Sequence, residues 1–254
     1  MSRLSAYTPA PAYGTGVYRR RIRLCAEADR VTAEMEDDPH AMRCRITHRG
    51  GIVTALEADF HRHPLTTCPG AHVPLGDLVG MAIDITAQGF FAGGRARQNC
   101  THMLDLAWLA MRQAARGPGE RLYAIDIADA VEDHARGVLR RDGEEILAWE
   151  VAGGGILSPA PFAGRPLLNG FVGWALAALE DDTMEAALVL QKGFFVADSR
   201  RVILPSGPIL PEEYPALGGA CFGFAMERIA AARRNNASRR DFTDRPEDLL
   251  AFRP

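Results

Sequence analysis

The first sixty residues alternate apolar and polar side chains over short stretches. Residues 17–24 place apolar side chains between arginines, and residues 42–47 repeat the alternation. This period of two puts the apolar side chains on one face of a strand. Gly50 and Gly51 precede the next apolar run and supply the positive φ that a tight hairpin turn needs. We therefore predict an antiparallel meander over residues 17–60.

The pattern then changes to helix. A short helix is predicted around residues 75–79, inside a passage rich in proline and glycine, and a longer one over about 99–115. Asn99 or Thr101 can serve as the N-cap of the longer helix, and Gly117 with the proline and glycine after it ends it. Apolar residues fall almost all the way round this helix, so we expect it to be largely buried.

The second half repeats the order of strands followed by helices. Runs of strands followed by helices are typical of the α+β class. We predict one α+β domain over 17–254, an antiparallel β-sheet meander packed with several helices, preceded by a flexible arm over 1–16. If it divides, its sub-lobes are 17–117 and 118–254. The further elements predicted are strands at 122–127, 135–139 and 146–151, and helices at 171–179, 182–191 and 221–234.

Composition narrows the class of protein. The formal net charge of −3 argues against nucleic acid as a partner, because phosphate-binding proteins usually carry a basic face. No apolar stretch reaches the ~20 residues that cross a bilayer, and the N-terminus lacks the apolar core of a signal peptide. Five cysteines without a secretion signal predict thiols in a reducing cytoplasm rather than a disulfide framework. The apolar segment 194–196 suggests a homodimer interface.

Side chains suited to chemistry are concentrated in one part of the chain. Imidazole and thiol groups are the usual proton shuttles, nucleophiles and transition-metal ligands. A reaction is therefore expected to depend on this part of the chain. It holds His40, His48, His61, His63, His72 and His102, together with Cys44, Cys68 and Cys100.

The strongest local candidate is Cys100-Thr101-His102 with Asp105, at the start of the longer helix. The dipole and open amides of a helix N-terminus stabilise anions and favour a thiolate. His102 and Asp105 share a helix face, so the carboxylate can orient the imidazole. Cys100 and His102 do not face each other, so a base for Cys100 has to come from another segment. In the alternative interpretation Cys100 is a small buried residue and His102 a capping or core residue.

Two further motifs have ordinary explanations. His61 and His63 share a face of a strand and could chelate a metal, but they fit better as surface residues at a strand end. The glycine-rich segment 89–95 lacks the Gly-Lys-Ser/Thr ending of a phosphate loop. His40 follows an Asp-Asp-Pro turn and opens the strand at 42–47, a position that either presents it to a site or leaves it solvated.

These residues resemble the bacterial family of unknown function DUF2889. The typical family motif Gly-Cys-Thr-His-Leu matches the chain at its Cys-Thr-His centre, with departures at Asn99 and Met103. The resemblance covers about residues 17–116. The matching stretches are His40-Ala41-Met42, Pro64 followed by Cys68, Leu78-Val79-Gly80, and Asn99-Cys100-Thr101-His102-Met103.

The resemblance implies no established reaction, but it separates a subset of residues from the other histidines and cysteines. It selects His40, Cys68, Cys100 and His102. It leaves out the residues that match no motif position, which are His48, His61, His63 and His72.

Two classes of function follow. The first is a catabolic enzyme (lyase, hydratase, isomerase or hydrolase) acting on a small hydrophobic or aromatic acid or its derivative. His40 or His102 would be its general acid or base, Asp105 would orient His102, and the helix terminus at Cys100 would bind an anion. A metal-dependent form would place His40, Cys68 and His102 around a divalent ion such as zinc. The second class is a non-catalytic binding or accessory protein for an acidic hydrophobic ligand or a partner subunit.

Overall fold

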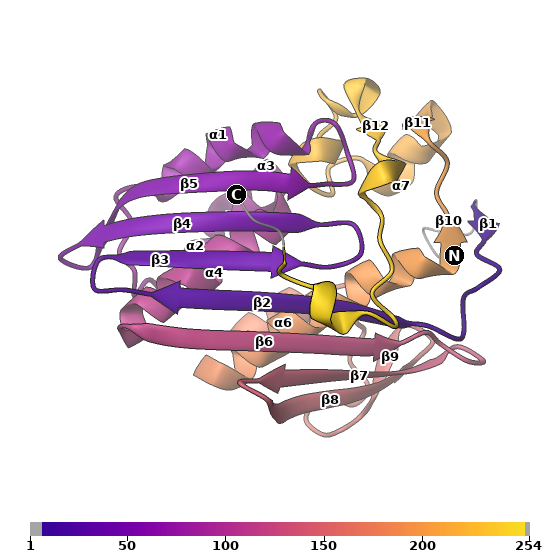
Figure 1. Ribbon diagram of the computed structural model, residues 1–254, viewed down its shortest axis with the longest axis horizontal. Helices are drawn as coiled ribbons and strands as arrows, with labels where there is room; N and C mark the ends of the chain where they lie inside the picture. The colour runs from indigo at the N-terminus through magenta and orange to yellow at the C-terminus, as the bar shows by residue number, and fades with distance from the viewer. Residues whose placement is uncertain (1–6, 252–254) are drawn as a thin grey trace. The chain divides into compact units, whose positions relative to one another are not determined.

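The computed structural model describes residues 7–251 (Figure 1). By its internal contacts the chain divides into two compact units, each drawn from separate stretches of sequence. The first consists of Met1–Arg21, Leu122–Leu204 and Asp241–Leu249, and the second of Ile22–Arg121, Pro205–Arg240 and Leu250–Pro254. The single domain predicted over 17–254, with its sub-lobes, stays a prediction.

Both units combine antiparallel strands with helices, so the predicted α+β class is confirmed. In the second unit the strands form the predicted meander in the order β5-β4-β3-β2 (Figure 1), and residues 22–26 of β2 belong to this unit. The hairpin turn lies at Gly50 and Gly51, whose φ angles of 57° and 77° favour glycine. The strands are β2 (Val17–Ala26), β3 (Arg30–Glu36), β4 (Ala41–Arg49) and β5 (Ile52–Arg62).

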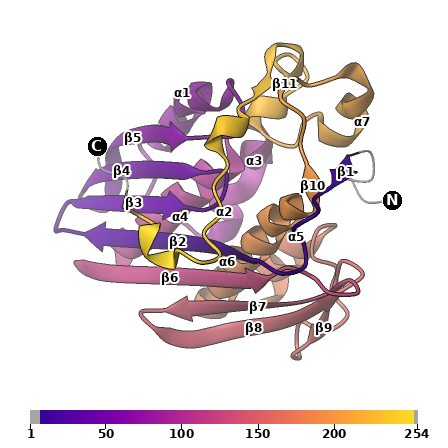
Figure 2. The same ribbon diagram turned by 45° about the vertical axis from the view of Figure 1, so that its right-hand side comes forward.

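One long helix, α4 (Thr101–Arg116), packs against β3 and β4 and lies behind them in Figures 1 and 2. Its buried residues lie on most of its circumference, as the apolar pattern predicts. The helix ends at Gly117, whose φ is +98°. The predicted short helix at 75–79 is confirmed, but helical turns begin earlier. The other short helices of this unit are α1 (His72–Leu75), α2 (Ala87–Phe91), α3 (Arg95–Gln98) and α7 (Tyr214–Leu217).

The predicted N-cap of α4 is wrong. Neither Asn99 nor Thr101 caps the helix, because Cys100 is the N-cap residue and its side chain forms no capping hydrogen bond. The Asn99 side-chain amide instead donates to the Arg95 carbonyl oxygen at 3.0 Å. That amide therefore secures the end of α3, and the first turn of α4 starts one residue later than a side-chain cap at Asn99 requires.

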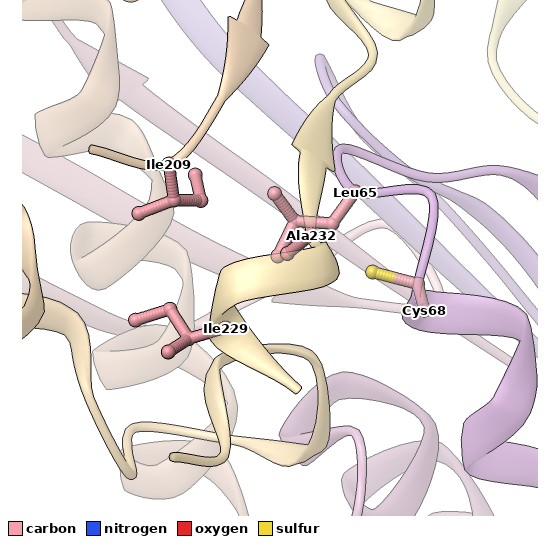
Figure 3. Close-up of a cluster of buried hydrophobic side chains, with 5 residues drawn as sticks. All are labelled: Leu65, Cys68, Ile209, Ile229 and Ala232. Carbon is pink, nitrogen blue, oxygen red and sulfur yellow. The ribbon is translucent and has the colours of Figure 1, made fainter. Parts of the chain in front are cut away.

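The predicted helix over 221–234 is also wrong. The segment forms two short 3-10 turns, Phe222–Phe224 and Ile229–Ala231, followed by strand β12 (Arg233–Arg234), which pairs with β11 (Gly207–Pro208). Several of its backbone groups bond to distant residues instead of along a helix. Two of its apolar residues, Ile229 and Ala232, belong instead to a buried cluster formed with distant segments (Figure 3). That cluster contains Leu65, Cys68, Ile209, Ile229 and Ala232.

The first unit has strands in the order β6-β7-β8-β9 and two helices, α5 and α6, that pack on each other. The strands and helices predicted between 122 and 191 are all confirmed. Trp149, a fully buried residue of β8, contacts the rings of Phe162, Phe171 and Phe194. The elements are β6 (Gly119–Ala128), β7 (His134–Arg141), β8 (Glu144–Ala152), β9 (Gly155–Ser158), α5 (Phe171–Ala178) and α6 (Asp181–Ala197).

The predicted flexible arm, residues 1–16, starts with residues 1–6, which lie outside the described range. In its remaining part, β1 (Thr8–Pro9) pairs antiparallel with β10 (Val202–Ile203). The Gly16 amide also donates to the Asp129 carboxylate at 3.0 Å. These contacts join residues 8–16 to the rest of the first unit.

The segment 194–196, from which a homodimer was predicted, is largely covered within its own unit. Phe194 and Val196 are buried, and only Phe195 is exposed. Two of the three side chains therefore need no second copy to cover them, and the homodimer stays a prediction. Over residues 7–251, no helix is both long and apolar enough to cross a membrane.

Candidate functional site

The candidate site starts at the tight turn between β3 and β4, in the second unit. Residues 37–40 form this turn, and the Asp37 amide donates to the His40 carbonyl oxygen at 2.9 Å to close it. Pro39 fixes one φ angle inside the turn. All four turn residues are buried, although three of them are ionisable. Burial of such groups costs free energy unless they are hydrogen-bonded. The hydrogen bonds of these side chains therefore determine their orientation.

Asp37 orients His40. Oδ1 of Asp37 accepts a hydrogen bond from the His40 backbone amide at 2.8 Å and lies 2.9 Å from Nδ1 of the imidazole. A carboxylate accepts hydrogen bonds, so in a neutral imidazole this contact favours the tautomer with its proton on Nδ1 and its lone pair on Nε2. His40 is 4% exposed and Asp37 is fully buried. The pair therefore has the geometry of a carboxylate-oriented imidazole base.

Arg62, at the end of β5, holds the backbone of the same turn. Its guanidinium donates to the carbonyl oxygens of Asp37 at 2.7 Å and His40 at 3.0 Å, and also to that of Asp38. It also forms an ion pair with Glu36 at 2.9 Å. Arg62 is itself buried. The planar guanidinium carries five N–H donors in a fixed geometry, so it holds several acceptors of one turn at once.

His102 meets His40 in space. The two ring centroids lie 4.2 Å apart with an angle of 36° between the ring planes. His102 comes from the first turn of α4, and α4 packs on the strands that the His40 turn connects. His102 is only half-buried. The structure therefore brings together the two histidines that the sequence singles out.

The other two predicted catalytic residues lie on the same helix. Cys100 is buried at the N-cap of α4, and Asp105 is half-buried one turn further on. The role of Asp105 in orienting His102 stays a prediction. The carboxylate that the structure does place against an imidazole is Asp37, on His40.

Cys68 lies in different surroundings from the histidines. It is buried in the apolar cluster of Figure 3, to which Leu65 also belongs. Burial, with the nearby Cys100 and Cys221, raises the pKa of the Cys68 thiol well above its usual value. Metals bind the thiolate, so this environment disfavours Cys68 as a ligand. Across residues 7–251, no three side chains of His, Cys, Asp or Glu are grouped so as to hold a metal ion.

The remaining histidines of the cluster lie elsewhere. His61 and His72 are exposed, and His48 is partly buried near the end of β4. His63 lies just beyond the end of β5, where its Nδ1 is 2.8 Å from the Leu65 carbonyl oxygen. These positions agree with surface or structural roles.

Two residues of the site escape sequence reasoning. Asp37 carries a usable signal, because an aspartate three residues before a histidine, with a proline between them, is typical of a turn in which the carboxylate caps the later amide. Arg62 carries none, because it stands between two histidines in an unremarkable strand and its acceptors, in residues 36–40 and at Ser238, are all far from it in the sequence.

Comparison with known proteins identifies no relative of this chain. No family model, no curated protein and no solved structure matches the chain. Membership of DUF2889 therefore stays a prediction from the Cys-Thr-His motif, and the function has to be argued from the site itself.

Proposed function

We propose that this protein is an enzyme that uses the His40–His102 pair for general acid/base catalysis on a small hydrophobic or aromatic acid or its derivative. One observation carries the proposal: His40 is oriented by Asp37 at 2.9 Å and packs against a second imidazole at 4.2 Å between centroids. Lyase, hydratase, isomerase and hydrolase reactions all need one group that takes a proton and one that returns it.

Each group has a role. Nε2 of His40 takes the proton, because Nδ1 is committed to Asp37 and the buried carboxylate stabilises the imidazolium that forms. His102, whose ring packs against that of His40, returns the proton. The start of α4 at Cys100 favours a negatively charged group on the substrate.

The metal-free form of the reaction is the one that we propose. The zinc alternative needs a Cys68 thiolate beside His40 and His102, and the burial of Cys68 in apolar surroundings works against ionisation of that thiol. The acid/base form requires only the two imidazoles and Asp37.

The first test observes the His40 ring directly. Long-range ¹H–¹⁵N NMR spectra of the folded protein should show the neutral form of the His40 ring with its proton on Nδ1. Asp37→Asn should shift the ratio of the two His40 tautomers towards the one protonated on Nε2. His61→Ala, at an exposed site, should leave this ratio unchanged. A His40 protonated on Nε2 in the unaltered protein would remove the proposed base.

The second test measures turnover. A panel of aromatic carboxylic acids, their hydroxy and unsaturated derivatives and their acyl thioesters is incubated with the protein, and products are identified by mass spectrometry. His40→Ala should lower kcat/KM by ~10²–10⁴-fold, and His102→Ala should also lower it, while His61→Ala stays within about twofold. Binding of these acids without turnover would instead favour the non-catalytic binding class.

A further inference from the structure

Three cysteines from separate segments of the second unit meet beside the start of α4. Cys100 is the N-cap of α4, Cys68 opens the 3-10 turn Cys68–Ala71, and Cys221 directly precedes the 3-10 turn Phe222–Phe224. All three are thiols in this structure. Nothing in the proposed acid/base chemistry uses Cys221.

A backbone hydrogen bond brings the segment of Cys221 next to that of Cys100. The Phe222 amide donates to the Asn99 carbonyl oxygen at 2.9 Å, and these two residues are the chain neighbours of the two cysteines. Cys100 and Cys221 both have extended backbone conformations. Because these neighbours are in direct contact, Cys100 and Cys221 lie close together. A disulfide bridges Cα separations of ~4.4–6.8 Å.

Tight packing holds the two 3-10 turns together. A Cβ atom on Gly70 would lie 3.1 Å from the Phe222 ring, and one on Gly223 would lie 3.8 Å from Sγ of Cys68. The segment after Cys221 is therefore seated closely against the segment after Cys68. This contact fixes where the Cys221 segment lies relative to Cys68.

The three thiols differ in access and in ionisation. Cys221 is half-exposed, whereas Cys100 and Cys68 are 6% and 7% exposed. Burial is the main cause that raises the pKa of the Cys68 thiol. Cys100 instead lies at the N-terminus of a sixteen-residue helix, where the dipole favours a thiolate. An oxidant therefore reaches Cys221 first, and Cys100 is the better placed of the two buried thiols to react with it.

We propose that Cys100 and Cys221 form a redox-active pair that closes to a disulfide when the protein meets a peroxide. The Cys221 sulfur attacks one peroxide oxygen, so that the O–O bond breaks, a sulfenic acid forms and one water leaves. The Cys100 thiolate then attacks the sulfenic sulfur, which forms the S–S bond and releases the second water with the proton of the Cys100 thiol. Two thiols are oxidised and one peroxide is reduced to two waters.

The bond would join the start of α4 to the 3-10 turn at 222–224. Its Cys100 end lies two residues before His102. Closure of the pair stands apart from the proposed function, because it can be measured without a substrate. Only an effect of the disulfide on turnover rests on the acid/base proposal for His102.

The test is peptide mapping of the full chain. The protein is treated with a small excess of hydrogen peroxide, alkylated, and digested with trypsin without reduction. Cys25, Cys68, Cys100 and Cys221 fall in different tryptic peptides, namely 24–30, 63–95, 98–112 and 202–228. We expect the 98–112 peptide to appear linked to 202–228, and the link to disappear on reduction with dithiothreitol.

Two variants make the result specific. Cys221→Ser and Cys25→Ser each remove one half-exposed thiol, and far-UV circular dichroism confirms that each variant is folded. Only Cys221→Ser should abolish the link. Two results would overturn the proposal. One is a link between 63–95 and 202–228 instead, and the other is a Cys221 oxidised to sulfinic acid while Cys100 stays alkylatable. The peptide map of the wild-type protein is sufficient to show either result.

Discussion

Glu34 of β3 is a carboxylate held between two arginines on adjacent strands. Arg23 Nε donates to its Oε2 at 2.9 Å, and Arg43 Nε donates to its Oε1 at 2.9 Å. The Glu34 side chain is 8% exposed. Burial raises the pKa of the Glu34 carboxyl, but the hydrogen bonds from Arg23 and Arg43 outweigh it and hold the pKa below its usual value.

This pKa makes stability depend on pH at the residue scale. A carboxyl with a lower pKa in the folded chain stabilises the fold fully above its unfolded-state pKa of ~4.3. The stabilisation is lost as the pH falls through the folded value. We therefore expect Glu34→Gln to lower the free energy of unfolding by about 2 kcal/mol at pH 7. The difference from wild type should shrink below pH ~4. Urea unfolding at several pH values measures both.

A matched control is available on the same sheet. Glu57 of β5 pairs with Arg45 at 3.3 Å, but its side chain is 70% exposed. Exposed pairs contribute little, so Glu57→Gln should change stability by less than ~1 kcal/mol at any pH. Equal effects of the two substitutions would show that burial of Glu34 between arginines is not what stabilises this part of the sheet.

At the scale of elements, α6 packs on β7 of the first unit through a position without a side chain. Gly137 of β7 pairs with Ile127 and Trp149 in the neighbouring strands. A Cβ atom at Gly137 would lie 2.5 Å from two ring carbons of Phe194, a residue of α6. The absence of a side chain is therefore what lets Phe194 lie against the sheet and stack on Trp149.

We expect Gly137→Ala to destabilise the first unit. The new methyl group must displace the Phe194 ring, a rigid side chain held by its neighbours, at a cost of about 2 kcal/mol. Urea unfolding followed by tryptophan fluorescence measures this, because Trp149 contacts Phe194.

Gly173 of α5 supplies the comparison for this substitution. A Cβ atom there meets nothing within 4 Å, and its φ is not in the left-handed region. Gly173→Ala should therefore be neutral, or stabilise the protein by up to ~1 kcal/mol through helix propensity. If Gly137→Ala were as harmless as Gly173→Ala, the close packing of α6 on β7 would be wrong.

At the scale of the whole molecule, the five thiols report where the folded chain admits a reagent. Cys44 of β4 is fully buried, and burial raises its pKa to about 12. Cys25 and Cys221 are half-exposed. Thiol reagents attack the thiolate, so both access and ionisation protect Cys44 in the folded protein.

We expect iodoacetamide at pH 8 to label Cys44 at least ~100-fold more slowly than Cys221 in the folded protein. In urea above the unfolding midpoint, all five cysteines should be labelled at similar rates, because the protection belongs to the fold. Mass spectrometry of peptides from a digest that does not cut at Arg43 and Arg45, which flank Cys44, measures each rate over time. Rapid labelling of Cys44 without urea would place that strand at an open edge.

Local patterns in the sequence determine most of the elements. The alternation over 17–24 and 42–47, the glycine turn at Gly50 and the apolar helix ending at Gly117 all correspond to elements of the structure, because each depends on neighbouring residues alone. The segment 221–234 shows the limit. Its composition favours a helix, but its backbone groups and side chains find partners in distant segments, and these contacts outweigh helix propensity.

The sequence by itself marks His40 and His102 as the histidines to consider, through the turn before one and the helix start at the other. Only the tertiary structure brings their rings to 4.2 Å and places the Asp37 carboxylate against His40. The reason is physical: these residues come from a hairpin and a helix far apart in the chain. Their meeting depends on the packing of α4 against β3 and β4, which no local pattern encodes.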